Sequence, residues 1–236
     1  MTTSNPTAHL PPPATAERAT LPGALLAASS LLAVALMAHH PSVSSHSMDA
    51  VLAEMAQKAP LAKLVHGGLI ALMGVQTFAL VELSTRLGWH RPAVRGAVLA
   101  YVAGTLAMVG AALISGFILP NIALRFEGAL GDAAEPLRYI VTASSLANRS
   151  LATFGAVAMS TGIALWSSVL ARGARGAQLV AALGFLVGIV PAVALLLGAL
   201  RLEVAGMTLV VVAQAAWNIA VGVALARGRL TVIRTP

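Results

Sequence analysis

The chain has no cysteine, little charge and few aromatic residues. The absence of cysteine excludes disulfide bonds, thiolate metal sites and iron–sulfur ligation by this chain. Charged residues make up 10% of the 236 residues, and only 8 are acidic against 15 Lys and Arg. Apolar residues make up 58%, and the mean hydropathy is +0.86, which lies well outside the range of soluble globular domains. The composition therefore predicts a protein whose main partner is the lipid bilayer.

Charged side chains are missing from six long apolar runs. A hydrocarbon core of about 30 Å requires roughly 20 apolar residues in a helix. We therefore predict an all-α integral membrane protein whose six transmembrane helices lie at about residues 21–38, 64–86, 96–119, 150–171, 176–200 and 204–226. Pro120 is expected to close the third of these helices, since proline disrupts helix interiors.

Positive charge is shared unequally between the two sides of this predicted bundle. Cytoplasmic connections of membrane proteins retain Lys and Arg. If the N-terminus is inside, the cytoplasmic side carries Arg18, Arg86, Arg91, Arg95, Arg172, Arg175, Arg227, Arg229 and Arg234. The basic residues of the other side, Lys58, Lys63, Arg125, Arg138, Arg149 and Arg201, are matched by Asp49, Glu54, Glu127, Asp132, Glu135 and Glu203. We therefore expect an N-in/C-in protein of a bacterial inner (plasma) membrane.

This topology divides the chain into a membrane domain, residues 21–226, and two cytoplasmic tails, residues 1–20 and 227–236. A competing interpretation treats residues 1–35 as a cleaved signal peptide with the small-x-small sequence Ala-Val-Ala at its end. The long Pro-rich leader is more typical of a disordered tail. The sequence pI is about 11.3, but the arginines are spread over short segments at helix ends, so no nucleic acid partner is expected.

Two helical hairpins of the chain resemble each other. Residues 95–99 and 104–106 match residues 175–179 and 184–186 at a constant offset of 80, and His66 aligns with Asn148 at an offset of 82. Both hairpins run in the same direction, so we predict a core of two parallel-repeat hairpins flanked by the first and last helices. Chance identity in a chain rich in Ala, Leu, Gly and Val is the alternative, and both interpretations remain open.

Short amphipathic helices are expected in the two outer loops. Ser47 suits the N-cap of a helix with one apolar face at residues 48, 51, 52 and 55, which would lie on the outer membrane surface. In the second loop Pro136 suits a helix start, and that helix is expected to continue into the fourth span. The turn before it is expected at residues 128–131.

Polar side chains within the spans are the first candidates for a binding site. They are His66, Asn148, Gln76, Gln214 and Asn218. In hydrocarbon such side chains need partners, so they are expected to face the interior of the bundle. One hypothesis is that they bind a solute that enters from the outer face. The other is that they form interhelical hydrogen bonds and bind no ligand.

Histidines near the outer face are the second candidate site. They are His39, His40, His46 and His66, and Met48 and Met55 are candidate thioether contacts. Imidazole binds copper and zinc. Adjacent residues point about 100° apart in a helix, so one ion would favour either His39 or His40. The alternative is that these are polar residues at the membrane boundary. The cofactor therefore stays unknown, with copper and zinc as candidates, and no haem is expected because paired histidines inside spans are missing.

No catalytic motif appears in the sequence, which lacks a Gly-x-Ser-x-Gly elbow, a His-Glu-x-x-His pair and a phosphate-binding glycine loop. We therefore favour a non-enzymatic membrane protein that binds or passes a small solute or ion from the outer face. Two alternatives are an outer-face metal-binding module for copper or zinc and a structural subunit of a larger membrane complex. Six helices are few for a monomeric transporter, so a homodimer is a further option.

Overall fold

The computed structural model describes residues 19–45, 47–126 and 134–230, and these residues contain helices and no strands. The elements are α1 (Thr20–Ala38), α2 (Met48–Leu87), α3 (Pro92–Leu113), the π-helical turn η1 (Ile114–Ile118), α4 (Leu119–Phe126), α5 (Ala134–Leu170), α6 (Arg175–Leu196) and α7 (Val204–Ala226). Among the described residues, six helices are long and apolar enough to cross a membrane, with α3, η1 and α4 counted as one. The prediction of an all-helical fold with six helices that are long and apolar enough to cross a membrane is confirmed.

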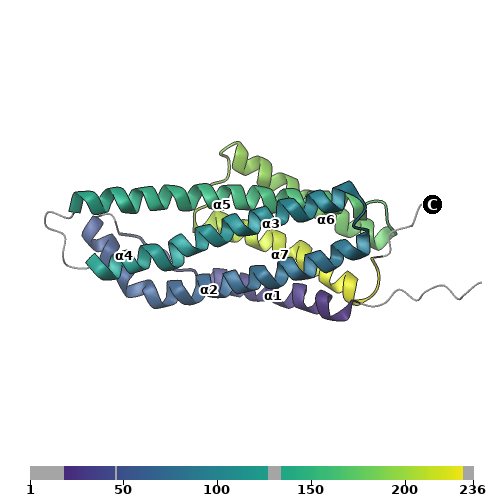
Figure 1. Ribbon diagram of the computed structural model, residues 1–236, viewed down its shortest axis with the longest axis horizontal. Helices are drawn as coiled ribbons and strands as arrows, with labels where there is room; N and C mark the ends of the chain where they lie inside the picture. The colour runs from purple at the N-terminus through teal and green to yellow at the C-terminus, as the bar shows by residue number, and fades with distance from the viewer. Residues whose placement is uncertain (1–18, 46, 127–133, 231–236) are drawn as a thin grey trace, which may run out of the picture.

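The helices fall into two length classes. α1, α6 and α7 have 19, 22 and 23 residues, which is about 29–35 Å at 1.5 Å per residue and matches the bilayer core. α2 and α5 have 40 and 37 residues, which corresponds to about 60 and 56 Å. In Figure 1 the ends of α2, α4 and α5 project beyond α1 and α7. We call this projection, residues 48–63, 119–126 and 134–149, the stalk.

The stalk has a small hydrophobic core of its own. Buried side chains from α2, α4 and α5 meet there, namely Leu52, Ala56, Ala123 and Leu137. Ser47 caps α2 as predicted, with its Oγ accepting a hydrogen bond from the backbone N–H of Ala50 at 3.3 Å. The expected separate surface helix is wrong, because α2 runs unbroken through Pro60. Its apolar face packs against α4 and α5 instead of lipid.

Pro120 does not end the third membrane helix, contrary to expectation. The helix continues to Phe126 through the π-helical turn η1. There the N–H of Leu119 bonds the carbonyl of Ile114, and the widened turn accommodates a proline that lacks an N–H. The expected continuity of α5 into the fourth span is confirmed, and Pro136 is its third residue. The turn expected at residues 128–131 lies outside the described residues.

Glycines bring two helix pairs into close contact. Gly23 of α1 faces Gly222 of α7, and a Cβ on either would collide with the backbone of the other helix. Gly104 of α3 and Gly155 of α5 have the same relationship. Small residues allow such close approach of membrane helices. The result is a bundle in which α1 lies along α7, and α3 lies along α5.

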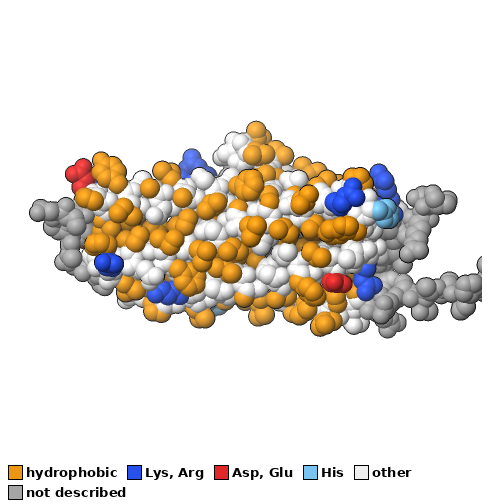
Figure 2. All heavy atoms as spheres, viewed as in Figure 1, with side chains coloured by type: hydrophobic (Ala, Val, Ile, Leu, Met, Phe, Trp, Pro, Cys, Tyr) orange, Lys and Arg blue, Asp and Glu red, His pale blue; other side chains and the backbone are white. Residues whose placement is uncertain are grey.

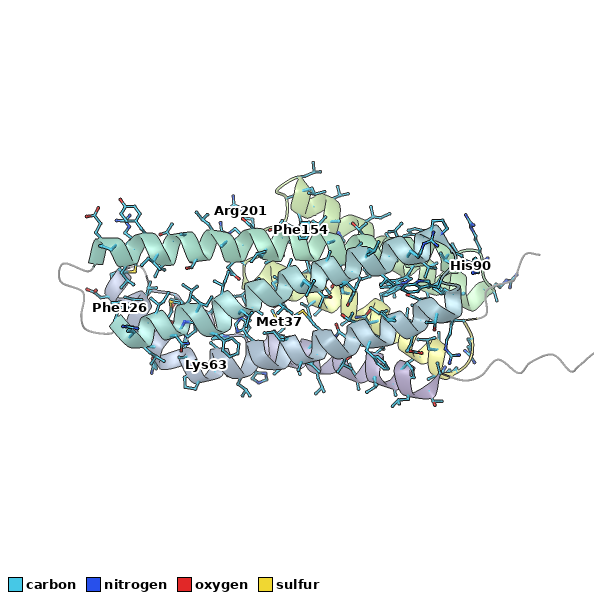
Figure 3. The ribbon with its side chains drawn as sticks, in the orientation of Figure 1. Met37, Lys63, His90, Phe126, Phe154 and Arg201 are labelled. Carbon is cyan, nitrogen blue, oxygen red and sulfur yellow. The ribbon has the colours of Figure 1, made fainter. Side chains whose placement is uncertain are left out.

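Both described ends of the membrane domain lie on the same side of the bundle. α1 begins and α7 ends at the end opposite the stalk (Figure 1). Figure 3 shows His90 at that end, Phe126 in the stalk and Met37 between them. Connections at the end opposite the stalk carry Arg86, Arg91, Arg95, Arg172, Arg175, Arg227 and Arg229. We call this end of the bundle the arginine-rich end. Along the side of the molecule that Figure 2 shows, hydrophobic side chains are exposed over most of the length of the bundle.

Candidate binding cavity

A cavity of about 740 Å³ lies at the base of the stalk. Side chains of α1, α2, α3, α5 and α7 line it, and its rim includes Pro41, Ser42 and Val43, which follow α1. The cavity begins where α1 ends and α7 starts, and it extends toward the middle of the bundle. Its volume is in the range of small-molecule binding sites.

All five residues of the predicted solute site line this cavity. They are His66 and Gln76 of α2, Asn148 of α5, and Gln214 and Asn218 of α7. His66 and Asn148 lie on the stalk side, whereas Gln76, Gln214 and Asn218 lie deeper. The structure thus brings together positions that are up to 152 residues apart in sequence. Their role as solute ligands stays a prediction.

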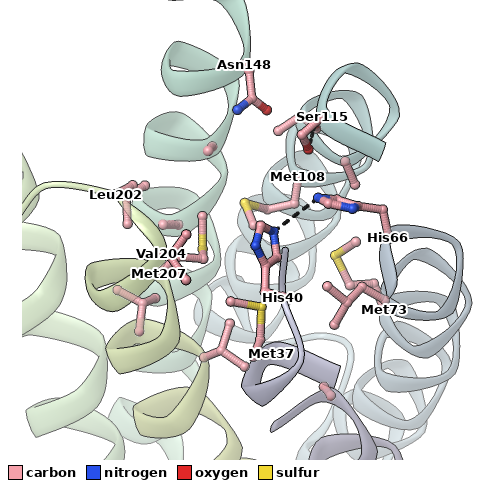
Figure 4. A pocket seen from close by; sticks show the side chains of 18 of the residues that line it. Met37, His40, His66, Met73, Met108, Ser115, Asn148, Leu202, Val204 and Met207 are labelled. Atoms are coloured by element: carbon pink, nitrogen blue, oxygen red, sulfur yellow. Dashed lines mark hydrogen bonds between the residues drawn. The ribbon is translucent and has the colours of Figure 1, made fainter. Parts of the chain in front are cut away.

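His40 and His66 form a pair on the stalk side of the cavity (Figure 4). Their Nε2 atoms are 3.2 Å apart, and the rings meet edge to face with centroids 4.8 Å apart. His66 Nδ1 lies 2.8 Å from the carbonyl oxygen of Ala62, so Nδ1 carries the hydrogen and donates it. In neutral His66 the Nε2 atom therefore has a free lone pair, which accepts a hydrogen from His40 Nε2.

This arrangement leaves one nitrogen of His40 without a partner. Its Nδ1 is buried and makes no hydrogen bond of regular geometry with any described residue, although a backbone contact with Pro41 partly offsets the effect of burial on the pKa of the ring. Burial lowers the pKa of His40 below its usual value of 6.5, because a charged ring is poorly solvated there. His40 is thus neutral at physiological pH, and its one nitrogen lone pair lies on Nδ1 while Nε2 donates to His66.

The other two histidines of the predicted metal site do not join the pair. His39 is exposed, and its Nδ1 bonds the carbonyl of Ala35 at 2.9 Å on its own helix. His46 lies outside the described residues. In the part of the chain that the structure describes, no group of three or more His, Cys, Asp and Glu side chains is placed to hold a metal ion.

The floor of the cavity presents amide groups. Gln76 Nε2 donates to Ser30 Oγ at 3.4 Å, and Gln214 Nε2 donates to Ser160 Oγ at 3.2 Å. Both hydrogen bonds use the amide nitrogen, so the Oε1 atoms remain as acceptors. Asn218 is 2% exposed and hydrogen-bonds the side chain of Tyr101. Its Oδ1 is buried and has no hydrogen-bond partner among the described residues.

Aromatic residues close the bundle below the floor. Tyr101, Trp166 and Trp217 are fully buried, with successive ring centroids 5.4 and 6.1 Å apart. Trp166 Nε1 donates to Ser84 Oγ at 2.9 Å, which satisfies the indole N–H. This aromatic cluster separates the cavity from the arginine-rich end.

Methionines are the cavity residues that sequence reasoning missed. Five of the eight in the chain line it: Met37, Met73, Met108, Met159 and Met207. Figure 4 shows the side chains of Met37, Met73, Met108 and Met207 around the histidine pair. The expected thioether contacts Met48 and Met55 pack instead in the stalk core. A useful signal would have been that these five methionines fall inside predicted spans, near the depth of the polar residues.

The segment after α1 is tied to the stalk, and this fixes the rim of the cavity. Glu54 Oε2 accepts hydrogen bonds from the backbone N–H groups of Ser44 and Ser45, both at 3.1 Å. Lys58 Nζ donates to the carbonyl of Ser42 at 2.6 Å and pairs with Glu54 at 2.7 Å. We call residues 41–45 the strap, because these bonds hold it against α2.

No family model, curated protein or solved structure matches this chain.

Proposed function

We propose that this protein binds a small solute or ion in the cavity at the base of the stalk. The observation that carries the proposal is the buried Oδ1 of Asn218, a residue of the cavity lining, which has no hydrogen-bond partner among the described residues. An unpaired buried acceptor costs about 1–3 kcal/mol. Polar side chains that served only to join helices would be expected to use such an atom in an interhelical bond.

The free groups in the cavity indicate what kind of ligand it accepts. Asn218 Oδ1 and the Oε1 atoms of Gln76 and Gln214 are all acceptors. A ligand that donates hydrogen bonds, or a cation, would satisfy them. Apolar side chains such as Leu69, Leu72 and Val210 also line the cavity, which suits a ligand with little exposed charge.

Membrane orientation decides from which side the ligand enters. Cytoplasmic connections retain Lys and Arg, so we propose that the arginine-rich end lies in the cytoplasm of a cell with a plasma membrane. Both termini are then cytoplasmic, and the stalk and cavity mouth lie outside. The aromatic cluster lies between the cavity and the cytoplasm, so passage across the membrane would require its rearrangement, whereas binding from outside would not.

A duplicated hairpin would explain why the cavity has polar residues on two sides. In the proposed repeat, α2 and α3 correspond to α5 and α6, and His66 corresponds to Asn148. Both of these residues line the cavity. Gly104 and Gly184 are also equivalent, and both lie at close helix contacts. These features support a parallel duplication around one pseudo-symmetric site.

Cysteine accessibility tests the proposal directly, because the chain has no native cysteine. We would make Gln214→Cys in the cavity, Leu209→Cys on the outer surface of α7 (58% exposed) and Val221→Cys in the core (0% exposed). A membrane-impermeant cationic methanethiosulfonate is added to intact cells and to inverted vesicles. We expect labelling of Gln214→Cys in intact cells, because a solute-binding cavity that opens outward would admit the aqueous reagent. Neither control should be labelled.

Each other result has a definite meaning. Unlabelled Gln214→Cys in both preparations would mean a dry cavity and would contradict solute binding. Labelling in inverted vesicles alone would keep the binding site and reverse the proposed orientation.

Exposed apolar residues of the stalk favour a second function, as a subunit of a membrane complex. Tyr139, Ile140 and Leu146 of α5 are 67, 51 and 59% exposed in the region proposed to lie outside the bilayer. Apolar residues clustered at a protein surface often mark partner sites. Purification from native membranes in mild detergent tests this function, and a homodimer or monomer without other proteins would count against it.

A further inference from the structure

The His40–His66 pair has the separation that two ligands of one metal ion require. Imidazole nitrogens bind first-row metal ions at about 2.0–2.1 Å. Two nitrogens 3.2 Å apart would then subtend an angle of about 100–106° at a shared ion, close to the tetrahedral value. The same separation makes one hydrogen bond when no ion is present, so the rings need little movement to bind an ion. The hydrogen that His40 Nε2 donates would move to Nδ1 of the same ring, which frees the Nε2 lone pair and keeps the ring neutral.

Supporting contacts around His66 are those of a metal-binding imidazole. Metal-ligating histidines commonly donate the second ring N–H to a carbonyl or carboxylate, which fixes the tautomer and the ring orientation. His66 Nδ1 makes this bond to Ala62, and its Nε2 points to His40. The strap holds the chain just after His40 through Glu54 and Lys58. Both ligating nitrogens are therefore positioned by the fold.

The remaining ligands available to an ion are thioethers and amide oxygens. The described residues contain no third His, Cys, Asp or Glu that would complete a metal site with this pair. Methionine side chains surround the pair instead (Figure 4). Soft thioether ligands favour cuprous ion, whereas zinc prefers imidazole, thiolate and carboxylate.

The charge of the surrounding groups also favours a monovalent ion over a divalent one. The side chains that Figure 4 labels around the pair carry no formal charge, and the two charged residues of the cavity lining, Arg149 and Glu203, have opposite signs. The cost of removing an ion from water grows with the square of its charge, so a divalent ion would need anionic ligands that the pair lacks. A monovalent ion needs far less compensation.

We propose that His40 and His66, together with the methionine thioethers around them, bind a soft monovalent cation, with cuprous ion as the best match. This inference rests on the proposed function, because it names the ligand class of the same cavity. It changes the predicted metal site in two ways. His39 drops out as a ligand, and Met37, Met73 and Met108 enter as candidates.

Competition with a coloured cuprous chelator tests this inference. The full chain is purified in detergent, and copper is kept as Cu(I) with ascorbate under argon while bathocuproine disulfonate competes for it. We expect one Cu(I) per chain in the wild type. His40→Ala and His66→Gln should each weaken Cu(I) binding by at least about tenfold, because two-nitrogen ligation is lost.

Two matched variants separate this site from other copper binding. His39→Ala removes the exposed neighbour of His40 and should leave the affinity unchanged. The triple variant with Met37, Met73 and Met108 each replaced by Leu keeps the side-chain volumes, and it should weaken Cu(I) binding while leaving the fold, measured by circular dichroism, unaltered. Zinc should bind at least about a hundredfold more weakly than Cu(I).

Three results would overturn the inference: equal Cu(I) affinity in wild type and His40→Ala, equal loss in His39→Ala and His40→Ala, or zinc binding as tight as Cu(I). If His66→Gln fails to fold, the comparison of His39→Ala with His40→Ala decides. Thiol labelling of Gln214→Cys is measured on the same preparations. Labelling without Cu(I) binding would overturn only the cuprous site, whereas loss of both would overturn the proposed function as well.

Discussion

His66 lies directly against Gly116, so closely that a Cβ at position 116 would overlap the Cβ and Cγ atoms of the histidine. Gly116 belongs to the π-helical turn η1, and single π turns inside α-helices occur frequently at functional sites. The missing side chain makes room for the imidazole beside α3. The contact therefore supports the orientation in which His66 Nε2 points to His40.

Gly116→Ala should destabilise the protein by about 1–3 kcal/mol, because the added methyl group has to displace His66 or move η1. The matched control is Gly74→Ala, at a helical glycine of α2 where a Cβ would meet nothing within 4 Å. That variant should be neutral or stabilised by up to about 1 kcal/mol, since alanine favours helix more than glycine does. Thermal unfolding in detergent measures both, and equal midpoints for the two variants would disprove the tight contact.

Ser84→Ala should destabilise the bundle through Trp166. The serine hydroxyl accepts the indole N–H in a buried site, and an indole N–H left without an acceptor costs about 1–3 kcal/mol. Thr161→Val is the control, because the Thr161 hydroxyl is exposed and bonds only the carbonyl of Val157 on its own helix. Unfolding followed by tryptophan fluorescence should show a loss for Ser84→Ala and little change for Thr161→Val. A small effect of both would mean that water or another group accepts the indole N–H.

Much of the fold is predictable because hydropathy is a property of local sequence. The six apolar helices follow from runs of about 20 residues that lack charge. The stalk was not predictable in the same way. Residues 48–63 contain charge and Pro60, and they stay helical because Leu52 and Ala56 find partners on α4 and α5. Tertiary packing therefore decides whether a helix continues beyond the bilayer, and local propensity does not.

The candidate cavity was predictable in its polar residues and not in its apolar ones. Gln76, Gln214 and Asn218 must turn inward because hydrocarbon offers no partner to an amide. A methionine such as Met108 gives no such signal, since its side chain suits lipid, core and cavity equally well. Which of His39 and His40 would face inward depended on how the chain leaves α1 after Ala38, and that is set by the strap.

Acid should destabilise the protein partly through His40. Burial lowers the pKa of His40 in the folded state below 6.5, so below about pH 6.5 the unfolded chain binds a proton that the folded protein resists. Above about pH 6.5 the His40 ring is neutral in both states and its titration does not reduce the free energy of unfolding. As the pH falls toward the lower pKa of the folded state, the free energy of unfolding decreases. Between about pH 7.5 and about pH 5, the melting temperature of the wild type should fall more than that of His40→Ala. His39→Ala should follow the wild type, and identical pH slopes for wild type and His40→Ala would contradict the burial of a neutral ring.

Glu54→Gln should loosen the strap without unfolding the protein. Glu54 is the common partner of the Ser44 and Ser45 backbone N–H groups and of Lys58. An ion pair that is open to solvent contributes little to global stability, so the melting temperature should change little. The strap forms part of the rim of the cavity, and its release should raise the rate at which a water-soluble thiol reagent modifies Gln214→Cys by several fold.

Glu135→Gln is the control, because this exposed carboxylate of the stalk lies in the first turn of α5, far along the chain from the strap. An unchanged rate in Glu54→Gln would mean that access to the cavity does not depend on the strap. If the reagent is cationic, a raised rate in both variants would indicate a general effect of removing negative charge from the stalk. Repeating the measurement with an uncharged reagent of similar size would separate this effect from release of the strap.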